Sequence, residues 1–313
     1  MKTANLSSFL NILILLAISH WSIAQQKAVL ITGATSGIGL KTTELLASKG
    51  HFVYAGARKQ EDMDRLNAIE NVQAVKLDVT KQEDIDAAVK TIREEGRGLY
   101  ALVNNAGVSI LSPLIETDEG ELKWMFDINV YGPYRVTKAF APLIIESKGR
   151  ITTTGSISGI LAGMFAGPYS MTKHAIEGFT DALAAEMEQF GVHVSVVDPG
   201  GFETKIREKG IASMEAALGR YENSPYREAY IKTLEGRATP RKNSDEVAEM
   251  FLKALFEDNP TRRYMIVPNE GQGTATITQA MREMLELNEN RAFTYDREGP
   301  IKFLDEELIN LNQ

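Results

Sequence analysis

The sequence has no cysteine and only four histidines. Without cysteine the chain can form no disulfide bond, no thiolate zinc site and no thiol nucleophile. The histidines do not fall into an H-x-x-H or H-E-x-x-H pattern; they are His20, His51, His174 and His193. We therefore expect no metal site.

Positive charge is also scarce, since 34 Lys and Arg residues stand against 42 Asp and Glu residues and the formal net charge is −8. An acidic chain without a long basic cluster is not expected to bind nucleic acid or an anionic membrane surface. The hydrophobic fraction of 43% is enough for a large globular core. This composition excludes disordered, collagen-like and coiled-coil proteins.

A strongly apolar segment lies near the N-terminus. It runs from Phe9 to Ile18, follows Lys2 and precedes Ser22-Ile23-Ala24, an arrangement typical of an export signal. About ten residues are short for a hydrocarbon core of ~30 Å. We expect residues 1–24 to be a cleaved signal, with an uncleaved membrane anchor as the alternative. The protein would then be exported (periplasmic or secreted) or attached to a membrane, although a cytoplasmic location stays open.

From Lys27 onward, short β-rich runs alternate with amphipathic helical stretches. Such alternation predicts an α/β fold, a doubly wound parallel sheet of the Rossmann type, as a single domain over residues 25–270. The predicted strands are 28–32, 52–55, 72–77, 100–103, 150–153, 193–197 and 264–267, and the predicted helices include 39–49, 84–95, 122–146 and 175–190.

The first predicted strand leads into a glycine-rich turn, Thr32-Gly33-Ala34-Thr35-Ser36-Gly37-Ile38-Gly39, and then into a helix. Such a turn presents bare backbone N–H groups and the positive end of the helix dipole to a pyrophosphate. Because it stands at the first strand–helix junction, we expect it to bind a dinucleotide. The expected contacts are Gly33, Thr35, Ser36, Gly37, Ile38 and Gly39.

Further motifs follow in order along the chain. They are Asp78 in Leu-Asp-Val-Thr, Asn104-Asn105-Ala106-Gly107, Asn129 in Asn-Val-Tyr-Gly, Ser156 thirteen residues before Tyr169 of Tyr-Ser-Met-Thr-Lys173, and Pro199-Gly200 followed by Thr204. With the T-G-x-x-x-G-x-G spacing of the turn, the chain resembles the short-chain dehydrogenases/reductases over residues 27–270. Within that family it is most similar to the retinol and hydroxysteroid dehydrogenase branch.

Tyr169 and Lys173 are four residues apart, so on a helix they share a face. A tyrosine hydroxyl, with an ordinary pKa of about 10, is a useful base near neutral pH only if its anion is stabilised. The Lys173 ammonium favours the phenolate, and an oxidised nicotinamide would add a second positive charge. We expect Tyr169 to move the hydroxyl proton of an alcohol during hydride transfer, and Ser156 to hydrogen-bond the substrate oxygen. The resemblance implies that Asn129 holds a water linking the lysine to solvent.

The resemblance also implies contacts along the rest of the cofactor. Asp78 and the backbone of Val79 would meet the adenine, and Pro199-Gly200 would turn the backbone towards the nicotinamide ring. Thr204 would bind phosphate or the carboxamide. The other implied cofactor contacts are Asn105, Ala106, Gly107, Tyr169 and Lys173. For the Asn-Asn-Ala-Gly segment, a turn that simply ends a strand is the alternative.

The end of the second predicted strand bears on the choice between NADP and NAD. A carboxylate there would bind the ribose hydroxyls and repel a phosphate, but the chain has Ala57-Arg58-Lys59. Arg58 can pair with a 2′-phosphate, so we expect NADP, with NAD possible. The alternative is that Arg58 and Lys59 are solvated loop charges. Ser36 also departs from many NADP-preferring relatives, which have a basic residue at that loop position.

Residues 157–165 and a helical lid over about 201–245 are expected to border the open side of the nicotinamide. The rim is apolar, which predicts a small hydrophobic alcohol or carbonyl substrate, unless half of these side chains are core; they are Ile160, Leu161, Met164 and Phe165. Residues 271–313 form a C-terminal extension. Its apolar side chains at helical spacing (Ile277, Met281, Met284 and Leu285) are expected to pack on the body or on a partner subunit, in a homodimer or homotetramer.

The sequence thus predicts an NADP-dependent alcohol or carbonyl oxidoreductase. One alternative is a non-catalytic, nucleotide-dependent regulatory module, although Ser156, Tyr169 and Lys173 are all present. Another is a lyase or epimerase acting on a sugar nucleotide, which usually has a different glycine spacing and a larger C-terminal domain. Export conflicts with the cytoplasmic pool of soluble nicotinamide cofactors, and this conflict stays open.

Overall fold

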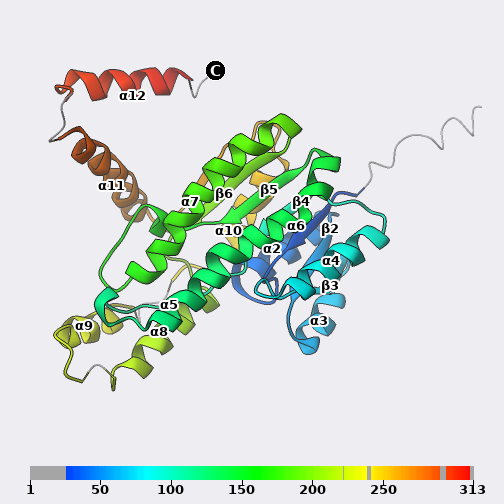
Figure 1. Ribbon diagram of the computed structural model, residues 1–313, viewed down its shortest axis with the longest axis horizontal. Helices are drawn as coiled ribbons and strands as arrows, with labels where there is room; N and C mark the ends of the chain where they lie inside the picture. Colours follow the sequence, from blue (N-terminus) through cyan, green and yellow to red (C-terminus); the bar gives the residue numbers. More distant parts are fainter. Residues whose placement is uncertain (1–25, 221, 238–240, 290–293, 311–313) are drawn as a thin grey trace, which may run out of the picture.

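The computed structural model describes residues 26–220, 222–237, 241–289 and 294–310 (Figure 1). The expected signal or anchor, residues 1–24, lies outside these residues. Seven parallel strands form one sheet in the order β3-β2-β1-β4-β5-β6-β7. The strands are β1 (Ala28–Ile31), β2 (Phe52–Ala57), β3 (Val72–Lys76), β4 (Ala101–Asn104), β5 (Arg150–Thr154), β6 (His193–Pro199) and β7 (Arg263–Ile266). The predicted doubly wound sheet is confirmed, and each predicted strand overlaps an observed one.

Helices cover both faces of this sheet (Figure 1). The α-helices of the described residues are α2 (Gly37–Ser48), α3 (Gln60–Asn67), α4 (Gln82–Glu94), α5 (Glu119–Phe126), α6 (Gly132–Ser147), α7 (Gly167–Met187), α8 (Lys205–Ala217), α9 (Arg227–Arg237), α10 (Asp245–Phe256), α11 (Glu270–Asn288) and α12 (Glu298–Asn310). One core cluster joins the sheet to α4, α6 and α7, and the other joins it to α2, α3 and α10. Leu30 points into the first cluster while Val29 and Ile31 point into the second, as the alternation of a strand requires. Both faces of the central strands are buried, which explains their nearly continuous apolar sequence.

Two predicted helices have different limits in the structure. The predicted helix over 122–146 is divided into α5, a π-helical turn (Asp127–Tyr131) and α6, which begins at Gly132-Pro133. The helix predicted to begin at 175 begins at Gly167 as α7, with Pro168 in its first turn. Proline suits that turn because its fixed φ is helical and its missing N–H has no intrahelical partner there. The earlier start places Tyr169 and Lys173 on one regular helix.

Two segments outside the sheet layers were expected from the sequence. The predicted lid region contains α8 and α9, which close a small core of Leu111, Phe165, Met214 and Tyr230. The C-terminal extension contains α11 and α12, which project from the body (Figure 1). The four apolar side chains of α11 expected to be covered are 45–50% exposed. They do not pack on the body, so that part of the expectation is wrong and the partner-subunit alternative stays a prediction.

Within the described ranges, no helix combines the length and the apolar character needed to cross a membrane.

Candidate active site

A pocket opens where β1, β2, β4, β5 and β6 reach their carboxyl ends, at the point where the strand order reverses. This is the usual ligand position in open α/β sheets. Every residue expected to contact the cofactor lines this one pocket: Gly33, Thr35, Ser36, Gly37, Ile38, Gly39, Arg58, Asp78, Val79, Asn105, Ala106, Gly107, Tyr169, Lys173, Pro199, Gly200 and Thr204. Ser156 lines it as well, whereas Asn129 lies behind the wall.

The glycine-rich turn has the geometry of a phosphate cradle. Gly33 has a φ of +66°, and a Cβ there would lie 2.9 Å from the Cα of Ala106, so no side chain fits. Ser36 is the N-cap of α2 but makes no side-chain capping hydrogen bond. The first N–H groups of a helix have no intrahelical partner. Together with the free cap, they form a site that fits the pyrophosphate of a dinucleotide.

Asn105 ties the strand ends around the pocket together. Its Nδ2 donates to the carbonyls of Thr32 (3.0 Å) and Gly33 (3.1 Å), and its Oδ1 accepts from Thr154 Oγ1 at 3.3 Å. These bonds join the ends of β1, β4 and β5. Asn105 therefore has a structural task besides lining the pocket, in agreement with the alternative considered for this segment.

The ends of β2 and β3 bring opposite charges together. Arg58 NH1 lies 3.9 Å from Asp78 Oδ2, and the Arg58 side chain is 68% exposed. Burial opposes ionisation of Asp78, but hydrogen bonds from Thr80 and the charge of Arg58 lower its pKa below the ordinary value. Asp62 of α3 also lines this end of the pocket and pairs with Arg65 at 2.8 Å. No motif marks Asp62, and sequence reasoning missed it.

Tyr169 and Lys173 lie on α7 facing the pocket. The surroundings of the Tyr169 hydroxyl desolvate it and raise its pKa to about 12, although a hydrogen bond with Ser156 acts in the other direction. Lys173 Nζ lies 5.6 Å from the centre of the Tyr169 ring and donates to the Thr154 carbonyl at 2.7 Å. Burial lowers the pKa of Lys173 to about 8.

The expected stabilisation of the phenolate by Lys173 stays a prediction. Desolvation raises the pKa of Tyr169, so Tyr169 is a neutral phenol near neutral pH in the cofactor-free protein. In this state it is a proton donor. The second positive charge expected from an oxidised nicotinamide would favour its ionisation.

Asn129 stands in the π-helical turn between α5 and α6 and is 2% exposed. Its Oδ1 accepts from the Val108 backbone N–H (2.8 Å), and its Nδ2 donates to the Val108 carbonyl (2.9 Å) and to Thr172 Oγ1 (3.1 Å). The side chain thereby joins the loop after β4 to α7. Its contact with a water stays a prediction.

The lid side of the pocket contains the remaining expected residues. Ser156 Oγ lies 3.5 Å from the Pro199 carbonyl, and Thr204 caps α8 by accepting from the Arg207 N–H at 3.3 Å. Four of the pocket-lining residues that no motif marked belong to the lid segment: Phe202, Lys205, Ile206 and Lys209. Periodicity could not find them, because their positions depend on how the lid folds back.

The apolar rim expected from residues 157–165 is divided between core and surface. Phe165 is buried in the lid cluster, whereas Met164 is 67% exposed. Ile160 and Leu161 are half-buried. One of the four side chains is therefore core, fewer than the half of the alternative, and none of the four lines the pocket.

With the fold and the pocket described, comparison with known proteins places the chain in a class. The family model for the short chain dehydrogenases matches residues 27–215. The chain belongs to the short-chain dehydrogenase family, as its motifs predicted.

Individual relatives refine this position. The chain is 40% identical over 186 residues to the mitochondrial D-beta-hydroxybutyrate dehydrogenase of Bos taurus, covering 56% of this chain and 54% of that protein, so it spans about half of that relative's length. It is 35% identical over 251 residues to the human 17-beta-hydroxysteroid dehydrogenase type 1, covering 75% and 76%. The solved structure of ElxO with NADP bound is similar with a TM-score of 0.65 and 26% identity, covering 80% of this chain and 99% of that one.

Proposed function

We propose that the protein is an oxidoreductase that transfers a hydride between NADP(H) and a hydrophobic primary or secondary alcohol or the corresponding carbonyl compound. The observation that carries the proposal is the convergence of Ser156, Tyr169 and Lys173 on the same pocket as the glycine-rich turn. A regulatory module would need the turn but not this combination of proton donor and ammonium.

The residues divide the chemistry among themselves. A bound nicotinamide supplies or accepts the hydride. Tyr169 donates a proton to a carbonyl oxygen during reduction and takes it back during oxidation, and Ser156 hydrogen-bonds the same oxygen. Lys173 holds a positive charge beside the tyrosine. Asn129 fixes the loop after β4 and, by resemblance to the family, would hold a water near the lysine.

NADP as the preferred cofactor is supported by charge at the end of β2. Arg58 and Lys59 line the pocket there, and residues 56–58 contain no acid. The ElxO relative, whose solved structure contains NADP, has the same fold. Asp78 and Asp62 are the opposing charges, so NAD is the second candidate.

The substrate class is supported by the apolar part of the pocket wall and by the relatives. Val108, after β4, and Ile206, in α8, line the pocket with apolar surface that could cover an apolar alcohol or ketone. The names of two relatives indicate hydroxybutyrate and a hydroxysteroid, and both of these are secondary alcohols. We infer that this protein also acts on a secondary alcohol or its ketone.

Turnover tests the proposal. Hydrophobic ketones are mixed with NADPH and the purified protein, and oxidation is followed by the nicotinamide absorbance, with the Tyr169→Phe variant as control. Turnover by the parent protein alone supports the proposal. Binding of NADPH without turnover of any ketone or alcohol favours the regulatory module.

Export or membrane attachment through residues 1–24, and assembly into a homodimer or homotetramer, are also proposed. The mass of the native N-terminus tests the first. A mature start at Gln25 supports a cleaved signal, whereas retention of Met1 with solubility only in detergent supports an anchor. Light scattering of the purified protein tests the second, and a monomer would contradict it.

A further inference from the structure

A carboxyl group outside the proposed catalytic set lies directly behind the candidate active site. Asp198 of β6 is 3% exposed, and its Oδ1 accepts a hydrogen bond of 2.9 Å from the Ser156 backbone N–H. A Cβ at Gly155 would overlap with the same oxygen, so glycine is required for this close approach. The Asp198 carboxyl therefore holds the backbone at Ser156 by this hydrogen bond.

The Asp198 side chain also faces a second carboxyl group, that of Glu177 on α7, and the two acidic groups influence each other's ionisation. Glu177 Oε2 accepts from Arg263 Nε at 2.9 Å, and Arg263 donates to Asp181 at 2.8 Å. The other oxygen, Glu177 Oε1, is buried and finds no donor among the described residues. Two carboxylates cannot donate to each other, whereas a proton on one of them supplies the missing donor.

The surrounding charges decide which carboxyl holds this proton. Burial and the neighbouring charge of Glu177 raise the pKa of Asp198 to about 8, against the opposing influence of the Ser156 N–H and of Lys173. Glu177 has Arg263 as its cationic partner. The electrostatic cost is lowest when the carboxyl paired with the arginine is ionised and the other carboxyl is neutral.

We propose that Asp198 is a positioning residue for Ser156, held as a neutral carboxylic acid whose proton is donated to the Arg263-paired carboxylate of Glu177. In this state one oxygen of Asp198 accepts from Ser156 while the hydroxyl donates to Glu177. Loss of the proton would place two carboxylates side by side and put a negative charge near Tyr169, whose ionisation it opposes. The location of the proton does not depend on the proposed function, but its effect on catalysis through Ser156 rests on that function.

Unfolding as a function of pH tests where the proton lies. The Asp198→Asn variant keeps an acceptor for Ser156 and a donor for Glu177 but has no proton to lose. In the unfolded chain Asp198 has an ordinary pKa near ~4, so its proton stabilises the fold fully below that pH, and the stabilisation is lost as pH rises towards about 8. Relative to Asp198→Asn, the unfolding equilibrium constant of the parent should rise by up to ~10-fold per pH unit between about pH 5 and about pH 8. Parallel curves for the two proteins would overturn the proposal.

Asp181→Asn is the matched control, because Asp181 pairs with the same arginine on its more exposed side. It should retain the pH dependence of the parent. Infrared spectroscopy gives a second readout that depends on no variant folding. The parent should show the carbonyl stretch of a protonated carboxylic acid near neutral pH and lose it in alkaline solution. A parent without this band near neutral pH contradicts the proposal.

Kinetics tests the connection to Ser156. Asp198→Ala removes the acceptor, so kcat should fall by at least ~10-fold with a smaller change in KM for NADPH, because a displaced serine no longer reaches the substrate oxygen. Asp198→Asn should restore most of the lost kcat. If Asp198→Ala keeps the kcat of the parent while Tyr169→Phe loses it, positioning is wrong and the proposed function stands. If the parent has no turnover, the proposed function fails, and the unfolding and infrared measurements still decide the location of the proton.

Discussion

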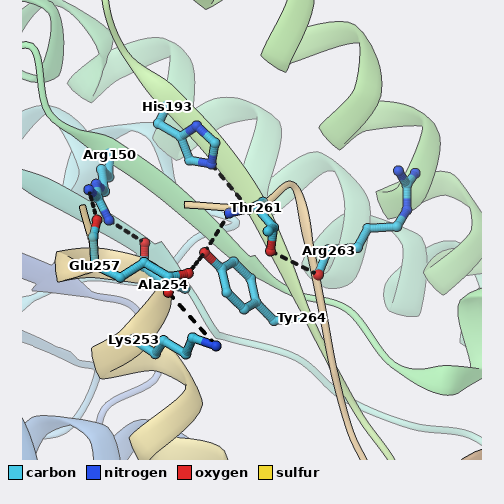
Figure 2. Close-up of polar contacts among 8 residues, drawn as sticks. All are labelled: Arg150, His193, Lys253, Ala254, Glu257, Thr261, Arg263 and Tyr264. Carbon is cyan, nitrogen blue, oxygen red and sulfur yellow. Dashed lines mark hydrogen bonds and ion pairs between the residues drawn. The ribbon is translucent and has the colours of Figure 1, made fainter. Parts of the chain in front are cut away.

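Polar side chains have different surroundings at the two ends of the parallel strands. We call the end where the strands begin the amino edge and the end where they finish the carboxyl edge. At the amino edge, Arg150 and His193 are the first residues of β5 and β6, and both are paired (Figure 2). Arg150 donates to the Ala254 carbonyl at 2.9 Å and to the Glu257 carbonyl, and the His193 ring is bonded to the Thr261 carbonyl at 3.1 Å. Figure 2 shows that these contacts converge on the end of α10 and on the segment between α10 and β7.

At this edge the hydrogen bonds supply partners for backbone carbonyls at the end of α10. The last carbonyls of a helix have no intrahelical donor, and the Arg150 guanidinium supplies donors at the end of α10, where positive charge is also favoured by the helix dipole. Tyr264 donates to Glu257 and accepts from the Thr261 N–H at 2.8 Å. In this network the polar groups are paired with one another, which leaves few donors and acceptors for a ligand.

At the carboxyl edge, groups that line the pocket have pKa values far from ordinary because the pocket desolvates them. Desolvation raises the pKa of Tyr169 and lowers that of Lys173, and Ser36 leaves its capping position unfilled. Perturbed groups of this kind cluster at functional sites. Substitutions at the carboxyl edge should therefore change turnover or cofactor affinity, whereas substitutions at the amino edge should change stability alone.

The largest expected effect is at the carboxyl edge. Tyr169→Phe keeps the ring and its packing but removes the hydroxyl that exchanges a proton with the substrate oxygen. We expect turnover to fall by at least ~100-fold with near-native NADPH affinity, measured by steady-state kinetics and by titration of NADPH binding. Reduction of a ketone by the variant at the rate of the parent would rule out the role of Tyr169.

A second effect at this edge concerns cofactor choice. Arg58→Ala removes a charge-assisted contact worth about 1.5–3 kcal/mol, or about 10- to 150-fold in NADPH affinity, while NADH affinity should hardly change. Ala57→Asp should shift the preference further from NADPH towards NADH, because a carboxylate repels the phosphate and accepts hydrogen bonds from the ribose hydroxyls. The measurement is kcat/KM for both cofactors in the parent and in both variants. A parent that prefers NADH, or an equal loss for both cofactors, makes Arg58 a solvated loop charge.

The two edges also differ in how far the sequence predicts them. The strands and the residues Ser156, Tyr169 and Lys173 follow from apolar runs and from spacing along one chain segment. The Glu177–Asp198 pair has no such signal. Glu177 is one helical turn beyond Lys173, but its meeting with Asp198 depends on how α7 packs on β6.

Burial is the second property that the sequence does not express. The charge of Lys173 predicts a lowered pKa for Tyr169, whereas desolvation in the folded pocket raises it. In α11, helical spacing predicts an apolar face correctly, but Met281 and Leu285 are about half exposed because the helix projects from the body. What covers a face is a property of the assembly and not of its periodicity.

A substitution at the amino edge tests the other half of the comparison. Arg150→Ala removes the donors at the end of α10 and should lower the free energy of unfolding by about 1–2 kcal/mol. Urea denaturation measures this loss, and kcat/KM at neutral pH should stay that of the parent. Arg262→Ala is the matched control, since this exposed arginine makes a 3.6 Å ion pair with Asp181 and its loss should change stability little. A large fall in kcat/KM for Arg150→Ala would show that the two edges are coupled.

The smallest expected effect concerns His193 and pH. Burial lowers its pKa, the bond to Thr261 opposes this, and the charges of Arg150 and Arg262 lower it further. A histidine with a lowered folded pKa binds fewer protons than in the unfolded chain, so the protein loses stability as pH falls through the ordinary histidine value of about 6.5. His193→Gln keeps a donor for the Thr261 carbonyl but does not titrate, so its stability should fall less between neutral and mildly acidic pH. Part of the slope should remain, because burial also lowers the pKa of His51.

Urea unfolding of both proteins at the two pH values measures the difference. An unchanged slope removes His193 as the source, and a loss of kcat/KM at neutral pH would mean that the amino edge serves the site as well as the fold.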